Sequence, residues 1–276
     1  MGMSTGFKRA LANKFLSFPM MSDFIIRLYP FATAKKFESI SQSRLIEILR
    51  TISIPSPNGY DLLRLGSQND GGYVSVNDFS DGDTLISLGI GDNLDFERDI
   101  SKRLGRILAF DHTVDLFDDK IENLTFVKLG VKAEPAANFT TLRGIIGDIS
   151  IIGDLILKID IEGWEWEVLD SLSSVELGRF KQIIGEFHGF HEIHNFEVIE
   201  RVVRKLSENF VVTNSHANNW GEYQIIQKIA FPDVLEISWL RKDRMKIASK
   251  FTPKTTENLN SVNNVNDLDL GFNLLQ

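Results

Sequence analysis

The fold is decided by the stretch DLILKIDIEGWEW, residues 154–166. It opens with the apolar run Leu155–Ile159, which only Lys158 interrupts, and it stops at the acidic, glycine-containing turn Asp160–Gly163. A short apolar run that ends in acids and a glycine, before a helical pattern, is typical of a buried parallel strand. Ligands of open α/β sheets bind at the carboxyl ends of such strands. We therefore expect Asp160 to lie at a functional site.

A second strand end of the same kind occurs earlier in the chain. Asp83–Gly91 reads as an apolar strand that runs into a glycine-containing loop, a helix follows to about Leu104, and Arg106–Asp111 reads as the next strand. In a Rossmann-type unit, glycines let the backbone approach a ligand, and an acid about 20 residues later accepts hydrogen bonds from ribose hydroxyls. Asp111 stands at that spacing from Gly91. The pattern predicts a nucleotide-like cofactor; a βαβ unit without a nucleotide is the alternative.

Strands and helices alternate along the rest of the chain. Strands are expected over residues 124–131 and 180–186, and helices over 140–149, 165–172 and 198–209. Residues 210–213 and 223–230 are predicted to form a terminal antiparallel pair around a loop at 216–220, and residues 234–240 a last strand. This alternation predicts an α/β domain with a doubly wound, mostly parallel sheet.

The chain divides into three regions. We predict an N-terminal helical appendage over residues 1–58, the main domain over 59–250, and a flexible, Asn-rich tail over 251–276. In the appendage, Ser41–Leu49 has apolar residues at helical spacing. Phe15–Phe31 is apolar, but prolines and charged residues break it before it reaches the ~20 residues of a membrane helix. We expect that segment to pack on the domain or on a second subunit, as in a homodimer; peripheral membrane contact is the alternative.

Composition restricts the class of protein. The 276 residues include 38 acidic and 30 basic side chains, a formal net charge of -8, with no Lys/Arg-rich block. This balance argues against nucleic acid as a main partner and favours a small-molecule substrate. The chain has no cysteine, which excludes disulfides, thiol catalysis and Cys-zinc sites and is consistent with a cytoplasmic protein.

A tight turn, Asn69–Gly72, separates two β-like runs within residues 61–76. Asn-Asp-Gly-Gly between such runs predicts a β-hairpin. A plain hairpin and a loop that crosses the ligand cleft both agree with the pattern. In the second case Tyr73, directly after the turn, would contact substrate.

Polar groups also follow the strand predicted at 180–186. Glu186 and His188 would lie beside Asp160 if the two strands are neighbours. Two carboxylates and an imidazole are ligands that suit Mg²⁺, Mn²⁺ or Fe²⁺, and such a metal would hold and acidify a substrate hydroxyl. The same residues can work without metal, with His188 as a general base oriented by a carboxylate. A structural His188, hydrogen-bonded in a polar cleft, is the third interpretation.

Three other polar positions are candidates. His112 directly follows Asp111 and is expected near the cofactor. His216 and Asn219 fall in a predicted loop, where they offer donors and acceptors for a sugar-like substrate; a simple Asx-rich turn is the alternative.

These segments together resemble the FkbM-type branch of S-adenosylmethionine (SAM)-dependent O-methyltransferases. The segment KIDIEG followed by a Glu-Trp helix is the most specific, and the Asn-Asp-Gly-Gly-Tyr turn and the His-x-Asn-Asn sequence strengthen it. The segments that carry the resemblance are residues 69–73, 85–97, 107–113, 154–169, 183–188, 216–220 and 231–242.

The resemblance implies a Rossmann-like class I methyltransferase fold, with a seven-stranded, mostly parallel sheet flanked by helices and SAM at the strand ends. It implies that Gly89, Gly91 and Asp92 line the methionine side of SAM, that Asp111 holds the ribose, and that Asp160 borders the transfer site. Asn93 stands where the family's fuller glycine pattern has a third glycine. Many relatives modify sugars or other secondary metabolites.

The predicted function is therefore SAM-dependent O-methylation of a sugar hydroxyl, in a nucleotide-sugar, a surface polysaccharide or a glycosylated natural product. Asp160, Glu186 and His188 are the predicted catalytic residues and the predicted ligands of a divalent metal. A non-catalytic Rossmann-like binding or scaffold subunit is the alternative. An NAD-dependent sugar oxidoreductase is a weaker one, because the chain lacks a Tyr-x-x-x-Lys pair and a dinucleotide glycine motif.

Overall fold

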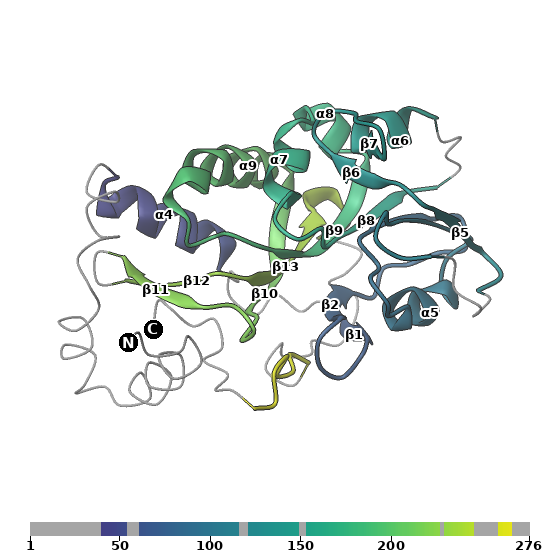
Figure 1. Ribbon diagram of the computed structural model, residues 1–276, viewed down its shortest axis with the longest axis horizontal. Helices are drawn as coiled ribbons and strands as arrows, with labels where there is room; N and C mark the ends of the chain where they lie inside the picture. Colours follow the sequence, from purple (N-terminus) through teal and green to yellow (C-terminus); the bar gives the residue numbers. More distant parts are fainter. Residues whose placement is uncertain are drawn as a thin grey trace.

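A seven-stranded sheet forms the centre of the protein (Figure 1). The computed structural model describes residues 40–53, 61–115, 121–148, 153–226, 229–245 and 259–266. In spatial order the strands are β10 (Phe210–Ala217), β13 (Leu235–Arg241), β9 (Phe180–Phe187), β8 (Leu155–Ile159), β3 (Thr84–Leu88), β4 (Arg106–Phe110) and β5 (Leu124–Val127). Only β13 runs against its two neighbours; all other pairings are parallel. The predicted doubly wound, mostly parallel sheet is confirmed.

The strand order reverses between β3 and β8, which lie side by side at the middle of the sheet. From β3 the chain proceeds outward through β4 to β5, whereas from β8 it proceeds the other way to β9. Every residue of β3 and β8 is buried, as expected for central parallel strands. Loops that leave two neighbouring strands in opposite directions open a crevice at the carboxyl ends of those strands.

Helices and a hairpin cover the two faces of the sheet. Residues of β8 alternate between two apolar clusters: Leu157 and Ile159 face the larger one, and Ile156 the smaller. The larger cluster includes helices α4 (Gln42–Ile52), α6 (Leu142–Asp148), α7 (Glu165–Asp170), α8 (Ser174–Leu177) and α9 (Phe196–Asn209). The smaller one joins α5 (Asp95–Ser101) to the hairpin β1 (Leu62–Gly66) and β2 (Gly72–Val76).

Helix α4 confirms the helix predicted from residue 41. The side chain of Ser41 caps it by accepting a hydrogen bond from the N–H of Arg44. Its apolar face is buried in the larger cluster, where α4 lies against α9 (Figure 1). Burying one Leu or Ile side chain stabilises a fold by about 1.5–3 kcal/mol. This part of the predicted appendage is thus a core element; residues 1–39, with the apolar segment 15–31, lie outside the described residues.

Two pairings differ from the prediction. The terminal antiparallel pair is β10 with β13, whereas β11 (Tyr223–Ile226) forms a separate hairpin with β12 (Ile229–Pro232). β13 is buried on both faces, so it lies inside the sheet between β9 and β10. The strand predicted over 124–131 ends early, and Gly130–Lys132 forms β6, which pairs with β7 (Phe139–Thr141).

The described part of the predicted tail, residues 259–266, lies against the edge of the sheet. Asn263 is buried and donates to Glu236 of β13. Asn264 exchanges two hydrogen bonds with the side chain of Asn219. The prediction of a flexible tail therefore does not describe this segment.

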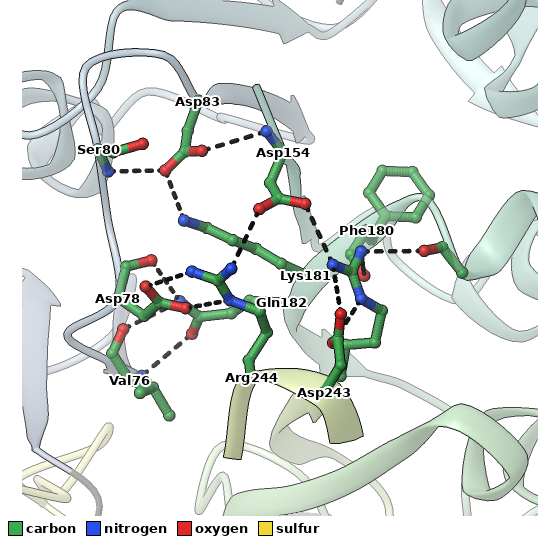
Figure 2. Close-up of polar contacts among 12 residues, drawn as sticks. Val76, Asp78, Ser80, Asp83, Asp154, Phe180, Lys181, Gln182, Asp243 and Arg244 are labelled. Carbon is green, nitrogen blue, oxygen red and sulfur yellow. Dashed lines mark hydrogen bonds and ion pairs between the residues drawn. The ribbon is translucent and has the colours of Figure 1, made fainter. Parts of the chain in front are cut away.

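An ion network ties the amino ends of the strands together, away from the crevice (Figure 2). Lys181 of β9 and Asp83, directly before β3, form a fully buried ion pair. Asp83 also accepts the N–H of Asp154, which precedes β8. Arg244 pairs with Asp78 at 2.7 Å. Breaking one partner of a buried pair leaves an uncompensated charge, so this network fixes the strands in register and leaves the opposite end for function.

Candidate functional site

A cavity of about 620 Å³ opens at the carboxyl ends of β3, β4, β8 and β9. The β1–β2 hairpin borders it, because the turn residues Asp70 and Gly71 line it together with Tyr73 of β2. The predicted hairpin is confirmed, and its turn also reaches the ligand cleft. A cavity of this size at the reversal of strand order is the expected place for a small ligand.

The glycine loop after β3 has a backbone that only glycine adopts readily. Gly89 has φ 73° and Gly91 has φ 54°. A Cβ on Gly89 would lie 1.6 Å from the carbonyl oxygen of Asp160, so a larger residue would push the ends of β3 and β8 apart. A Cβ on Gly91 would meet nothing within 4 Å. The loop thus presents its backbone to open space, which suits close approach by a cofactor.

Asp111 shapes this loop. One of its carboxylate oxygens accepts the N–H groups of Ile90 and Gly91, both at 3.0 Å. The other accepts the N–H and the hydroxyl of Thr113, at 2.7 and 2.6 Å. Burial raises the pKa of Asp111, but these hydrogen bonds outweigh it and hold the pKa below its ordinary value. A carboxylate has about four acceptor positions, and these four donors occupy all of them. A ribose hydroxyl that binds Asp111 would therefore have to replace the hydroxyl of Thr113.

Aromatic rings and a lysine form the outer wall of the cavity. The ring of His112 lies 4.6 Å from that of Phe139, centroid to centroid. The ammonium of Lys132 lies 4.0 Å from the Phe139 ring and 4.1 Å from the Trp164 ring. All four side chains line the cavity beside Gly91 and Asp92. Flat surfaces such as those of the paired His112 and Phe139 rings fit a planar base, so SAM is compatible with the residues present.

Asp160 lines the cavity beside the glycine loop, and its side chain is held in place by neighbouring residues. The hydroxyl of Tyr73 donates to it at 2.8 Å. Burial, followed by the charge of Asp160, raises the pKa of Tyr73 well above its ordinary value, so the phenol stays a donor. The ammonium of Lys158 donates to the carbonyl of Gly89 and lies 3.8 Å from Asp160. Lys158 was not among the predicted site residues; a lone charge inside an apolar strand is the signal that marks it.

Glu186, at the end of β9, lines the cavity beside Asp160. The amide of Asn218 donates to one of its oxygens at 2.9 Å, and Nε2 of His188 lies 3.3 Å from the other. Burial raises the pKa of Glu186 to about 7. The hydrogen bond from His188 opposes this shift, and the charges of Asp160 and Glu236 add to it.

His188 lies between two carboxylates. Its Nδ1 is 3.1 Å from Glu165, which is fully buried, and its Nε2 faces Glu186. Burial lowers the pKa of His188, but Glu165 and Glu186 outweigh it and raise the pKa to about 11. Glu165 also accepts the N–H groups of Ile161 and Gly163, at 2.8 and 3.1 Å. It thereby fixes the turn after β8, and the sequence prediction missed it, although its place at the start of a helix after a glycine turn is a usable signal.

The predicted metal site meets two obstacles. Ligand atoms of Asp160, Glu165 and His188 lie within 4.8 Å of one another, so Glu165 takes the place predicted for Glu186 in the tightest group. Both nitrogens of His188 face carboxylates in this structure, whereas a metal needs a neutral imidazole. Glu165 is committed to His188 and to backbone N–H groups. A metal bound by these residues would have to replace the contacts that His188 and Glu165 make with each other.

Two predicted substrate contacts do not line the cavity. His216 still belongs to β10 and is buried, with Nδ1 3.6 Å from Glu236. Asn219 is engaged with Asn264. Asn218 does not line the cavity either, but its buried amide contacts two residues that do: Glu186 and, at 3.5 Å, Asp70.

Comparisons with known proteins agree with this description. Residues 80–210 match the family model "Methyltransferase FkbM domain". Structural likenesses include an rRNA methylase from Streptococcus thermophilus (10% identity, 59% of this chain and 89% of that chain, TM-score 0.36). They also include SMU.1697c from Streptococcus mutans in complex with SAH (14% identity, 59% and 89%, TM-score 0.33). These TM-scores are too low to support a conclusion, and none of the curated proteins compared with the chain matches it.

The sheet order, the single reversed strand and the glycine loop at the central crevice define a Rossmann-like class I methyltransferase fold. The match of residues 80–210 to the FkbM methyltransferase model agrees with the motifs and supports methyl transfer from SAM. None of the described helices combines the length and hydropathy that crossing a bilayer requires.

Proposed function

We propose that the protein transfers a methyl group from SAM to a hydroxyl of a sugar. The observation that carries the proposal is the convergence of Asp160, Tyr73 and Glu186 in the cavity, next to the glycine loop where the cofactor is expected. Oxygen groups able to orient and deprotonate a hydroxyl thus lie next to the place expected for the cofactor.

SAM supplies an already activated methyl group. The task of the chain is to hold the acceptor hydroxyl in line and to take its proton. Glu186 is positioned to accept the proton of the acceptor hydroxyl, because it borders the cavity and its pKa of about 7 matches neutral pH. Asp160, fixed by Tyr73, is placed to accept a hydrogen bond from the acceptor. His188 orients Glu186 as its cationic partner.

A divalent metal is the other route to an activated hydroxyl. Because His188 and Glu165 are committed to each other, we propose that transfer proceeds without metal. Activity should then survive EDTA, and elemental analysis of the purified protein should find no stoichiometric Mg, Mn or Fe. Loss of activity in EDTA with recovery on adding one of these ions would overturn the metal-free proposal.

The test of the proposed function is a methyl-transfer screen with labelled SAM against free, nucleotide-linked and polymeric sugars. Asp160→Ala and Glu186→Gln should each lose activity by at least about 100-fold, the usual contribution of a positioned acid or base. Glu122→Gln is the matched control, because Glu122 is exposed and precedes β5 at the opposite end of the sheet. Full turnover by Asp160→Ala would refute the placement of the transfer site.

Calorimetry separates this proposal from its rivals. A methyltransferase binds SAM and S-adenosylhomocysteine and does not bind NAD. Tight NAD binding without SAM binding would favour an oxidoreductase. SAM binding without transfer to any acceptor would favour a binding or scaffold subunit.

A further inference from the structure

The charge of the cavity restricts the acceptor more than its shape does. Seven carboxylate side chains and two lysines line it, among the described residues. Lys158 donates to the Gly89 carbonyl and lies 3.8 Å from Asp160, and Lys132 lies between two aromatic rings. Both ammonium groups are therefore already engaged by neighbouring groups. A phosphate placed here would meet carboxylates and would have to compete for these two lysines, the cations on which phosphate recognition depends.

The acceptor wall, by which we mean the part of the cavity formed by Asp70, Tyr73, Asp160 and Glu186, carries several carboxylates close together. The Nδ2 of Asn218 lies 2.9 Å from Glu186 and 3.5 Å from Asp70, so one amide spans both acids. Asp160 lies on the same wall. The guanidinium of Arg64 lies behind the hairpin turn, where it donates to the carbonyls of Ser67 and Asn69. No Arg appears among the described residues that line the cavity.

An exposed aromatic at the cavity provides an independent indication of the ligand. Trp164 lines the cavity and is 41% exposed, although large apolar side chains are usually covered. Its ring is held in place by the ammonium of Lys132 at 4.1 Å. Sugars present C–H groups on one face, which pack on an indole ring, and hydroxyls at their edges, which reach carboxylates. A flat apolar ring beside an acidic wall therefore suits a sugar without phosphate.

We propose that the cavity selects a phosphate-free sugar acceptor and prefers one that carries an ammonium group near the reacting hydroxyl, with that group facing Asp70. Like charges brought together in a partly desolvated site cost several kcal/mol, whereas an ammonium beside a carboxylate is attracted. Nucleotide-linked sugars and nucleic acids would then be excluded by charge. The proposal rests on the proposed function, because it concerns the acceptor of the same site.

Binding to the full chain, loaded with S-adenosylhomocysteine, tests the proposal. The probes are glucosamine, glucose and glucose 6-phosphate, titrated by ligand-observed NMR at about pH 6, where the amine is protonated. Glucosamine should bind about fivefold more tightly than glucose, the effect of an ion pair near a surface. Glucose 6-phosphate should bind more weakly than glucose, and added salt should narrow both differences.

Substitutions that remove one charge test whether Asp70 is the source of the preference for glucosamine. Asp70→Asn should reduce the preference for glucosamine over glucose to about twofold or less, and should leave binding of S-adenosylhomocysteine unchanged. Glu122→Gln removes the same charge far from the cavity and should retain the full preference. Trp164→Ala should weaken glucose and glucosamine alike.

Three results would overturn the proposal: tighter binding of glucose 6-phosphate than of glucose, an unchanged preference in Asp70→Asn, or no binding of any of the three sugars. Failure of the proposed function looks different, because the protein would then transfer no methyl group to any sugar in the screen, or would not bind S-adenosylhomocysteine. The transfer screen and calorimetry with S-adenosylhomocysteine therefore precede the sugar titrations.

Discussion

Glu165 is the residue whose removal should reveal most about the site. It is fully buried and contacts the ring of His188 at 3.1 Å and the N–H groups of Ile161 and Gly163. Glu165→Gln keeps the shape but replaces a carboxylate by an amide. The imidazolium of His188 then keeps Glu186 at 3.3 Å and the exposed Glu162 at 3.6 Å, but loses its fully buried carboxylate partner.

The expected cost follows from these contacts. Breaking one partner of a buried ion pair costs about 3–5 kcal/mol. Because Glu186 remains and a glutamine oxygen can still accept one hydrogen bond, we expect the lower end, about 3 kcal/mol. For a chain of this size that corresponds to a fall in Tm of about 6–12 °C. Glu167→Gln, an exposed residue on the same helix, should change Tm by no more than about 2 °C.

The pH dependence gives a second check. His188 has a folded-state pKa of about 11, above the ordinary value of 6.5. Its charge therefore stabilises the fold fully below about pH 6.5, and this stabilisation is lost as pH rises through about 11. The difference in Tm between the native protein and Glu165→Gln, measured by circular dichroism, should be largest near neutral pH and shrink toward high pH. A constant difference, or an unchanged Tm at pH 7, would refute the role assigned to Glu165.

Three further predictions concern the same cavity, and a fourth concerns the contact of the segment 259–266 with the sheet. Gly89→Ala should abolish SAM binding measured by calorimetry, because its Cβ would lie 1.6 Å from a carbonyl oxygen; wild-type affinity would contradict the loop geometry. In the native enzyme, kcat/KM should rise with pH through about 7 as Glu186 ionises, and a flat profile from pH 6 to 8 would exclude Glu186 as the base. Tyr73→Phe should lower kcat by about 10-fold or more with SAM affinity intact, and equal losses in both would indicate a merely structural tyrosine. Asn263→Ala should lower Tm by about 2–4 °C, because it leaves buried Glu236 without its donor.

Much of the fold could be predicted from the sequence alone. The glycine loop, the acid at Asp111 and the acidic turn after Ile159 all follow apolar strands, and carboxyl ends of parallel strands meet at one edge of a sheet. Local pattern therefore predicted that Gly91, Asp160 and Glu186 would share one cavity, and they do. The helix from residue 42 and the Asn69–Gly72 hairpin are likewise consequences of local periodicity and turn chemistry.

Pairing between residues far apart in the sequence could not be predicted from local pattern. The position of β13 between β9 and β10 depends on which strand edges remain open after the parallel sheet forms, and the sequence of the strand does not state it. The choice between Asn218 and Asn219 depends on one residue of register, because successive side chains leave the backbone in different directions.

The chemistry of the acids was decided by tertiary structure alone. Glu165 and Glu186 are the same residue type, and only their surroundings separate them: Glu165 has a lowered pKa among donors, and Glu186 a raised one in a buried wall. By itself the sequence determined which strand ends carry polar groups, because the hydrophobic pattern sets strand positions and ends. Tertiary structure decided that His188 is a cation between two carboxylates, because burial and charge at a site come from residues far apart along the chain.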